Sequence, residues 1–330
     1  MSIKKVLVIG GGGYVGSQLV TRLLSLDYKV TVFDTFWFGS EHLQPYSRYG
    51  LNIVTGDIRD LARLNENISN QDAVIHLACI SNDPSFDLNP KLGKSINLDP
   101  FLPLVQAAKK TNLKRFIYAS TSSVYGVKQE DKVTELLPLE PLTDYSKYKA
   151  ECESILLNEV DDEFTTSILR PATVCGYSIR QRFDLSVNIL TANAVINNKI
   201  MVFGGTQFRP NLHITDMVDA YIMMLEKPDS LIHREIFNVG GENLSMSNIA
   251  NIVKDQMDTD VVIEHTHTDD LRSYRIDSTK INKVIGFAPK KGVKDAVIEI
   301  KEAFLAGLYD KPYNDPKYIN ISKMKDLKLG

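Results

Sequence analysis

The sequence predicts an α/β fold: a doubly wound parallel sheet, with a smaller α/β lobe toward the C-terminus. Two observations predict it. Over the first 170 residues, short apolar runs rich in Val and Ile alternate with longer stretches of helical length, which is the pattern of βαβ units. A cluster of glycines follows the first apolar run directly, at the place where a doubly wound sheet has its first turn.

The apolar runs have the length of strands and show no polar alternation. Strands that are covered on both faces have this pattern. The runs are Val6–Ile9, Val30–Phe33, Asn52–Val54, Ala73–Leu77, Arg115–Ala119 and Ser167–Leu169. Helical stretches such as Tyr14–Leu26 and Leu88–Thr111 lie between them. Pro100 and Pro103 predict a break in the second of these helices, because proline cannot donate the helical hydrogen bond.

After Pro171 the alternation loosens and the loops lengthen. We therefore expect a Rossmann domain over residues 1–170 and a substrate-binding lobe over residues 171–330, with some later segments returning to the first domain. The polar composition beyond Lys311 predicts a tail that wraps the surface. In this second part we expect helices at Thr215–Glu226, Ser245–Met257 and Val293–Leu308, and strands at Met201–Phe203, Ile236–Val239 and Val261–Glu264.

Composition excludes several classes of protein. The 330 residues carry a net charge of −3, so no basic excess would hold nucleic acid or an anionic membrane. The first apolar run stops after four residues, which is too short for a signal peptide or a membrane span. The chain has 3 widely separated cysteines, and His265 and His267 have no third ligand at a suitable spacing. We expect a cytoplasmic protein without disulfides or a bound metal.

Gly10, Gly13 and Gly16 form the phosphate-binding pattern of a dinucleotide site. They follow the first strand, and Tyr14 and Val15 open the helix behind them. Backbone N–H groups at such a helix N-terminus face a pyrophosphate, and a Cβ would block its approach. A plain tight turn is the alternative interpretation.

Acidic and apolar residues at the ends of the next strands add to the predicted cofactor site. Asp34 ends the second strand, where a carboxylate accepts the ribose hydroxyls and repels a 2′-phosphate, which favours NAD over NADP. Asp57, followed by Ile58, is placed to accept from the adenine amino group, although Gly-Asp also forms turns. His76 precedes Leu77 and Ala78 at the end of the fourth strand, and we expect it to be a packed histidine.

A tyrosine, a lysine and a cluster of hydroxyls form the predicted catalytic group. Tyr145 and Lys149 lie four residues apart on one helix face. An ammonium near a phenol lowers the pKa of the phenol, which then acts as a general acid and base. Ser and Thr residues end the fifth strand within residues 119–126, where substrates bind. A second such pair, Tyr313 and Lys317, is interrupted by Pro316 and carries no chemistry.

With these motifs, the sequence resembles the extended short-chain dehydrogenase/reductases, specifically the NAD-dependent nucleotide-sugar epimerase/dehydratase family, over almost its whole length. The resemblance implies that Thr121 is the catalytic hydroxyl, and that Ser122 and Ser123 face the substrate. It also implies a nucleotide-diphosphate sugar as partner and a homodimer formed by helices like Leu88–Thr111 and Asp144–Val160. The remaining cofactor contacts it implies are Asn97 and Pro171, and the arginines it implies for the diphosphate are Arg209 and Arg272.

Departures from the family pattern narrow the reaction. Relatives that remove water carry Asp-Glu after the threonine, whereas Ser122 and Ser123 stand here and cannot supply that acid and base. The resemblance therefore implies a 4-epimerase that works through a transient 4-keto sugar. A nucleotide-sugar 4-dehydrogenase or reductase, a hydroxy-acid or amino-acid dehydrogenase, and a non-catalytic NAD-sensing protein are the alternatives.

Overall fold

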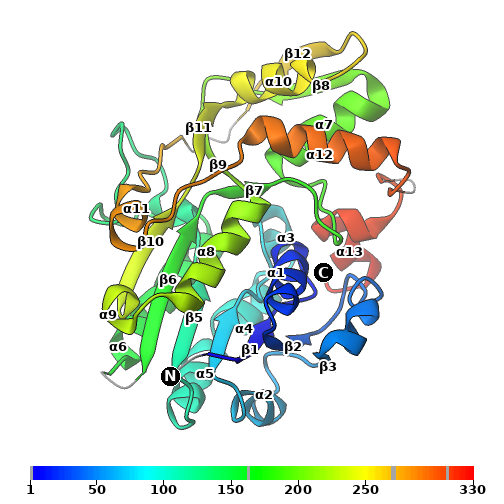
Figure 1. The fold of residues 1–330 in the computed structure, drawn as a ribbon. Coiled ribbons are helices and arrows are strands. Elements are labelled where there is room, and N and C mark those ends of the chain that lie inside the picture. Colours follow the sequence, from blue (N-terminus) through cyan, green and yellow to red (C-terminus); the bar gives the residue numbers. More distant parts are fainter. Residues whose placement is uncertain (1–2, 162–163, 269–272, 310–311) are drawn as a thin grey trace.

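The computed structural model describes residues 3–161, 164–268, 273–309 and 312–330. Its centre is a seven-stranded sheet in the order β10-β6-β5-β4-β1-β2-β3, in which every neighbouring pair is parallel (Figure 1). The six apolar runs all form strands of this sheet, so the predicted fold class is confirmed. The strands are β1 (Lys5–Ile9), β2 (Lys29–Asp34), β3 (Leu51–Thr55), β4 (Ala73–His76), β5 (Arg115–Ala119), β6 (Thr165–Pro171) and β10 (Glu235–Val239).

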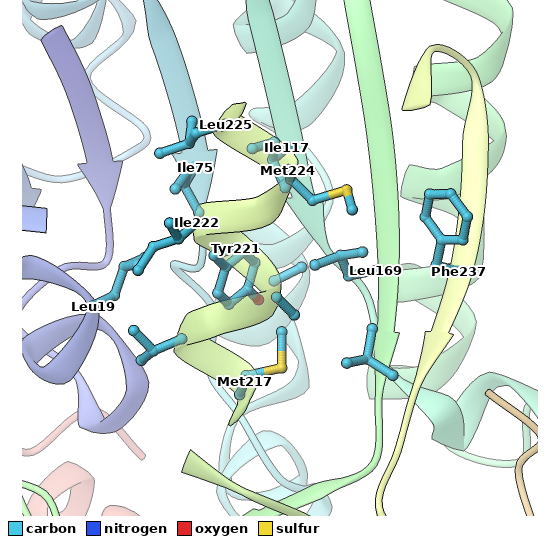
Figure 2. Packing of buried hydrophobic residues seen from close by; sticks show 14 of the residues in the cluster. Leu19, Ile75, Ile117, Leu169, Met217, Tyr221, Ile222, Met224, Leu225 and Phe237 are labelled. Atoms are coloured by element: carbon cyan, nitrogen blue, oxygen red, sulfur yellow. The ribbon is translucent and has the colours of Figure 1, made fainter. Parts of the chain in front are cut away.

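Successive side chains of each strand enter two separate cores, because side chains alternate across a sheet. Val6 and Val8 pack on one face with α1 (Tyr14–Ser25), α8 (Ile214–Glu226) and α11 (Thr279–Ile285). Figure 2 shows the side chains of α8, Tyr221 among them, against the strands. Leu7 and Ile9 pack on the other face, where the helices are α2 (Leu61–Ile68), α4 (Pro90–Asn97), α5 (Phe101–Lys109) and α6 (Asp144–Glu159). Both faces are thus apolar, which explains the absence of alternation in the sequence.

Most of the later elements form a second lobe with its own core, drawn at the top of Figure 1. Val187, Val202 and Val297 lie in this core. By contrast, β10, α8 and α11 belong to the central sheet and its first covering layer. The lobe consists of β7 (Thr173–Cys175), β9 (Phe208–His213) and β11 (Glu242–Ser245) in one small sheet, β8 (Lys199–Phe203) paired with β12 (Val262–Thr266), and helices α7 (Ser186–Asn197), α10 (Met246–Asp255) and α12 (Val293–Leu305).

Two local features differ in how well the sequence predicts them. The break at the prolines is confirmed, since α4 ends at Asn97 and α5 begins after Pro100. Helix α7 was not predicted, because its polar residues are buried and no amphipathic pattern marks it. Asn188 accepts a hydrogen bond from the Gly176 N–H at 3.1 Å, and Thr191 Oγ1 donates to the Val187 carbonyl at 2.7 Å. A tertiary partner thus satisfies Asn188, whereas Thr191 bonds within the helix itself.

The C-terminal tail is mostly exposed or half-buried, as the prediction of a surface tail requires, but three of its residues anchor it in the protein. Tyr318, Asn320 and Met324 are buried, and Met324 packs in the core that contains Phe86. The tail carries η3 (Pro316–Tyr318) and α13 (Asn320–Asp326), which lies beside α3 (Asp83–Leu88). The remaining short helices are η1 (Gln44–Tyr49), η2 (Ser122–Tyr125) and α9 (Asp229–Ile232).

None of the described helices is long and apolar enough to cross a membrane. Within the same residues, no group of three or more His, Cys, Asp or Glu side chains is arranged to hold a metal ion.

Candidate active site

Two cavities lie along the carboxyl ends of the central strands, where ligands bind in doubly wound sheets. The Asp34 cavity is lined by Gly10, Asp34, Asp57, Ile58, Leu77 and Ala78, among others. The Tyr145 cavity, of about 450 Å³, is lined by residues of the central sheet and of the second lobe. Of the predicted residues, those that line it are Tyr14, Val15, Thr121, Ser122, Ser123, Tyr145, Pro171 and Arg209. The predicted cofactor and substrate residues therefore fall mainly into two adjoining spaces.

Tyr145 stands in the first turn of α6, at the wall of its cavity. The helix begins at Thr143, whose Oγ1 accepts a hydrogen bond from the Ser146 N–H at 3.3 Å, and Ser146 Oγ bonds back to the Thr143 N–H. Such a capping box fixes the start of a helix. It holds Tyr145 at the wall of the cavity that Thr121 also lines, with the Thr121 hydroxyl near enough to lower the pKa of the phenol. The structure thus brings together two of the three predicted catalytic groups.

The environment of Tyr145 differs from the predicted one. Burial raises the pKa of its phenol well above the usual value, and Cys79 and Asp83 raise it further. The positive charge of Arg182 and the hydrogen bond with Thr121 lower it. The predicted fall in the phenol pKa beside Lys149 is therefore not found, because desolvation dominates.

Lys149 is buried under the carboxyl end of β5. Its Nζ donates to the Ala119 carbonyl at 2.6 Å and lies 4.9 Å from the centre of the Tyr118 ring. One turn later on α6, Glu153 pairs with Arg170 of β6, and Ser120 Oγ donates to Glu153. These contacts tie the helix to the two strands whose ends carry the hydroxyl cluster and Pro171.

Ser122 and Ser123 line the cavity, and their hydroxyls also form hydrogen bonds within the protein. Ser123 Oγ lies 3.0 Å from Thr121 Oγ1, and Ser122 Oγ lies 3.2 Å from the Tyr274 hydroxyl. Ser123 therefore orients the Thr121 hydroxyl, whereas Ser122 links η2 to the segment before α11.

The glycine turn fits a dinucleotide. A Cβ at Gly10 would come within 2.5 Å of the Ala78 N atom, and one at Gly16 within 2.4 Å of the Gly10 carbonyl oxygen. Gly10 also has a φ of 87°, which favours glycine. The turn therefore packs directly on the loop after β4, and α1 starts behind it at Tyr14. Backbone N–H groups at this helix start form the anion site expected of a phosphate-binding turn.

Asp34 is oriented by two backbone donors. Its carboxylate accepts from the Gly12 N–H at 2.9 Å and from the Phe36 N–H at 2.8 Å. Burial raises the pKa of this carboxyl, although the two N–H groups and the nearby Arg180 lower it. A carboxylate held at the rim of the glycine turn fits the adenosine ribose of NAD.

We expect Asp34→Ser to weaken NAD binding by about tenfold or more, since hydrogen bonds to a charged group contribute roughly 1.5–3 kcal/mol. The preference for NAD over NADP should fall as well, because the carboxylate no longer repels a 2′-phosphate. Calorimetric titration of each cofactor measures both effects, with the exposed Asp99→Ser as the control. Unchanged affinity for NAD would mean that Asp34 does not contact the cofactor.

Two predicted cofactor contacts have protein partners instead. Both Asp57 oxygens accept from Arg59, with Oδ2 2.6 Å from Nη2, and this pair lowers the pKa of the Asp57 carboxyl. Asn97 Oδ1 accepts from the Ile80 N–H at 2.8 Å, and its Nδ2 donates to the Ile80 carbonyl at 3.0 Å. Asp57 still lines the Asp34 cavity. Asn97, through its two hydrogen bonds to the Ile80 backbone, fixes the loop after β4.

His76 is a packed histidine, as predicted. It is buried, with its ring centre 5.7 Å from those of Phe101 and Tyr118. Burial lowers its pKa to about 3, so the ring stays neutral at physiological pH.

Of the two predicted diphosphate-binding arginines, Arg209 lies on β9 and lines the Tyr145 cavity. Arg272 lies outside the described residues. The stretch after β4 contributes to the same cavity, because Ser81, Asn82 and Asp83 line it. Thr173 lines it too, whereas Cys175 is buried in the core of the second lobe.

Several residues of the Tyr145 cavity were missed from the sequence. They come from the loop between β7 and α7, from the segment before α11 and from the C-terminal tail: Arg182, Asp184, Tyr274 and Ile321. The two arginines Arg180 and Arg182 were the available signal, since two buried arginines two residues apart are rare in a structural loop.

The model of the NAD-dependent epimerase/dehydratase family matches residues 6–240. A UDP-glucose 4-epimerase of Lactobacillus helveticus is 28% identical over 317 residues, which cover 89% of this chain and 94% of that protein.

Solved structures agree with the sequence comparison. The UDP-glucuronic acid 4-epimerase of Bacillus cereus, solved with UDP-glucuronic acid and NAD, superposes with a TM-score of 0.82 and 26% identity, over 92% of this chain and 100% of the other. A UDP-N-acetylglucosamine 4-epimerase of Methanobrevibacter ruminantium, in complex with UDP-N-acetylmuramic acid, gives a TM-score of 0.84 at 25% identity, over 93% and 100% of the two chains. The relative and the two solved structures named here are thus 4-epimerases of UDP-linked sugars.

Proposed function

Because this chain belongs to the NAD-dependent epimerase/dehydratase family, we propose that it inverts C4 of a nucleotide-diphosphate sugar through a 4-keto intermediate. The observation that carries the proposal is that Thr121 and Tyr145 line the same cavity of about 450 Å³, with the Thr121 hydroxyl near enough to lower the pKa of the phenol. Relatives named as 4-epimerases of UDP-linked sugars support the position of the inverted carbon.

The protein's own groups perform the proton transfer. Tyr145, in the phenolate form that the Arg182 charge and the Thr121 hydroxyl favour against burial, takes the proton of the C4 hydroxyl. It returns the proton to the same oxygen when hydride is restored to the opposite face of C4. Thr121 Oγ1 donates a hydrogen bond to the reacting oxygen and keeps it beside the phenol, and Ser123 orients Thr121. When bound, NAD supplies the acceptor and donor of hydride. Gly10, Gly13, Gly16 and Asp34 would hold it beside Tyr145 and Lys149.

The sugar and the nucleotide face the second lobe. We assign a cofactor domain (1–170, to which α8, β10 and α11 return) and a substrate lobe (the rest of 171–330), because β9, with Arg209, and the loop after β7 line the Tyr145 cavity. Arg209 would contact the diphosphate, because its planar guanidinium meets phosphate oxygens in pairs.

A panel of UDP-, GDP-, CDP- and dTDP-linked sugars tests the proposed function. The panel includes UDP-glucose, UDP-N-acetylglucosamine and UDP-glucuronate, and the products are read by NMR. We expect one member to reach an equilibrium mixture of two C4 epimers without net NADH. In deuterated water, no deuterium should enter C4, because the hydride leaves and returns within one site.

Other outcomes would contradict the proposal. Stoichiometric NADH with a released keto sugar would identify a dehydrogenase. NAD binding without conversion of any sugar would favour a non-catalytic NAD-sensing protein.

We also propose a homodimer formed through α5 and α6. This proposal rests on the family resemblance, and Leu102 on α5, which is 38% exposed, would lie in the interface. Light scattering should give twice the chain mass of 37.1 kDa, and a monomer at all concentrations would contradict the dimer.

The three free cysteines support the proposed location in a reducing cytoplasm.

A further inference from the structure

Arg182 is a buried cation at the wall of the Tyr145 cavity. It is 8% exposed, and its guanidinium has two protein partners. Nε donates to Asp184 Oδ1 at 2.8 Å, and Nη1 donates to Ser81 Oγ at 3.1 Å. Nη2 is also buried and has no acceptor among the described residues. A buried guanidinium N–H without an acceptor is costly, so a ligand oxygen is its natural partner.

Asn320 forms hydrogen bonds with Ser81 and Asp184, the two residues that Arg182 contacts. Its Nδ2 donates to Ser81 Oγ at 3.0 Å, and its backbone N–H donates to Asp184 Oδ2 at 3.0 Å. Its Oδ1 accepts from Arg180 Nη2 at 2.9 Å. Asn320 is 6% exposed, so water competes little for these bonds. The orientation of Arg182 therefore depends on a residue more than a hundred positions later in the chain.

The surrounding tail is anchored firmly enough for this role. The Tyr318 carbonyl accepts from the Phe183 N–H at 2.8 Å, and the Leu329 carbonyl accepts from Asn89 Nδ2 at 3.0 Å. Met324 packs in the main core between these two points. Next to Asn320, Ile321 lines the Tyr145 cavity itself.

We propose that Asn320 and Ile321 of the tail complete the sugar site: Asn320 fixes Arg182 so that its Nη2 donates to an oxygen substituent of the bound sugar, and Ile321 forms part of the wall. This inference rests on the proposed function. It identifies Arg182 as the group of the substrate site that determines which sugar binds. Arg182 contacts the sugar in this assignment, and Asn320 is a positioning residue.

A double-mutant cycle tests the link, using the nucleotide sugar that the panel identifies. Arg182→Ala should raise KM by about tenfold or more while kcat changes less, because a binding contact is lost. Asn320→Ala should raise KM in the same direction. The double variant should have the KM of Arg182→Ala alone, since Asn320 acts through that side chain. Lys325→Ala, exposed on the same helix, is the matched control and should leave KM unchanged.

Additive effects in the cycle, or an unchanged KM in Asn320→Ala, would overturn the inference. Hydrogen exchange provides a second measurement that needs no substrate. Amides of residues 180–184 should exchange faster in Asn320→Ala than in Lys325→Ala at equal thermal stability, and equal rates would also overturn it. If the wild-type protein converts no sugar, the proposed function fails on that result, and the exchange rates still decide whether Asn320 holds this loop.

Discussion

Tyr145→Phe is expected to lower kcat by a factor of about 10² to 10⁴, the usual contribution of a positioned general acid and base. The substitution removes one hydroxyl at the wall of the cavity that Thr121 also lines. The ring itself keeps its packing against the neighbouring apolar residues. NAD binding and the melting temperature should therefore change little. Steady-state rates at saturating sugar, together with cofactor titration, measure the two expectations separately.

The helix offers a matched control for this substitution. Tyr148 lies three residues later on α6, half-buried, with its ring centre 5.7 Å from that of Phe86. Tyr148→Phe removes the same hydroxyl away from Thr121 and should keep most of the activity. Equal losses in the two variants, or near-full activity in Tyr145→Phe, would mean that the phenol does not carry the proton.

The sequence predicts the central sheet well because its strands are buried on both faces. Val6 to Ile9 must all be apolar when alternate side chains enter two cores, and such runs are easily recognised. The glycine turn is equally predictable, because Gly10 and Gly16 leave no room for a Cβ. Tyr145 and Thr121 could be placed together because strand ends and helix starts meet at one edge of a parallel sheet.

The parts that could not be predicted depend on partners far away in the chain. Asn188 is polar and lies in a buried helix, and its hydrogen bonds to Gly176, Tyr14 and Arg182 explain its burial. No pattern near Asn320 in the sequence indicates that it forms hydrogen bonds with Ser81 and Asp184. Likewise, the spacing of Tyr145 and Lys149 says nothing of the desolvation that raises the phenol pKa. Local patterns report local geometry, whereas these features are set by the tertiary environment.

One buried ion pair connects the catalytic helix to the sheet. Arg170 and Glu153 are 4% and 3% exposed, with Nη2 2.5 Å from Oε2. Arg170 Nη1 also donates to the Tyr125 hydroxyl at 2.8 Å, which donates in turn to Asn238 Oδ1 at 2.7 Å. This chain of bonds links α6, η2, β6 and β10 behind the hydroxyl cluster. Its loss should therefore affect both stability and the position of Thr121.

Glu153→Gln should lower the free energy of unfolding by about 3–5 kcal/mol, because it leaves the Arg170 charge buried without a counterion. Urea titration with an unchanged slope measures this loss. Asp99→Asn breaks the exposed pair with Lys94 and serves as the control, with no measurable change expected. Replacing both partners, as Glu153→Leu with Arg170→Met, should recover part of the loss, since no unpaired charge then remains. If Glu153→Gln costs no more than Asp99→Asn, water reaches Arg170, and the pair does not hold the catalytic helix against the sheet.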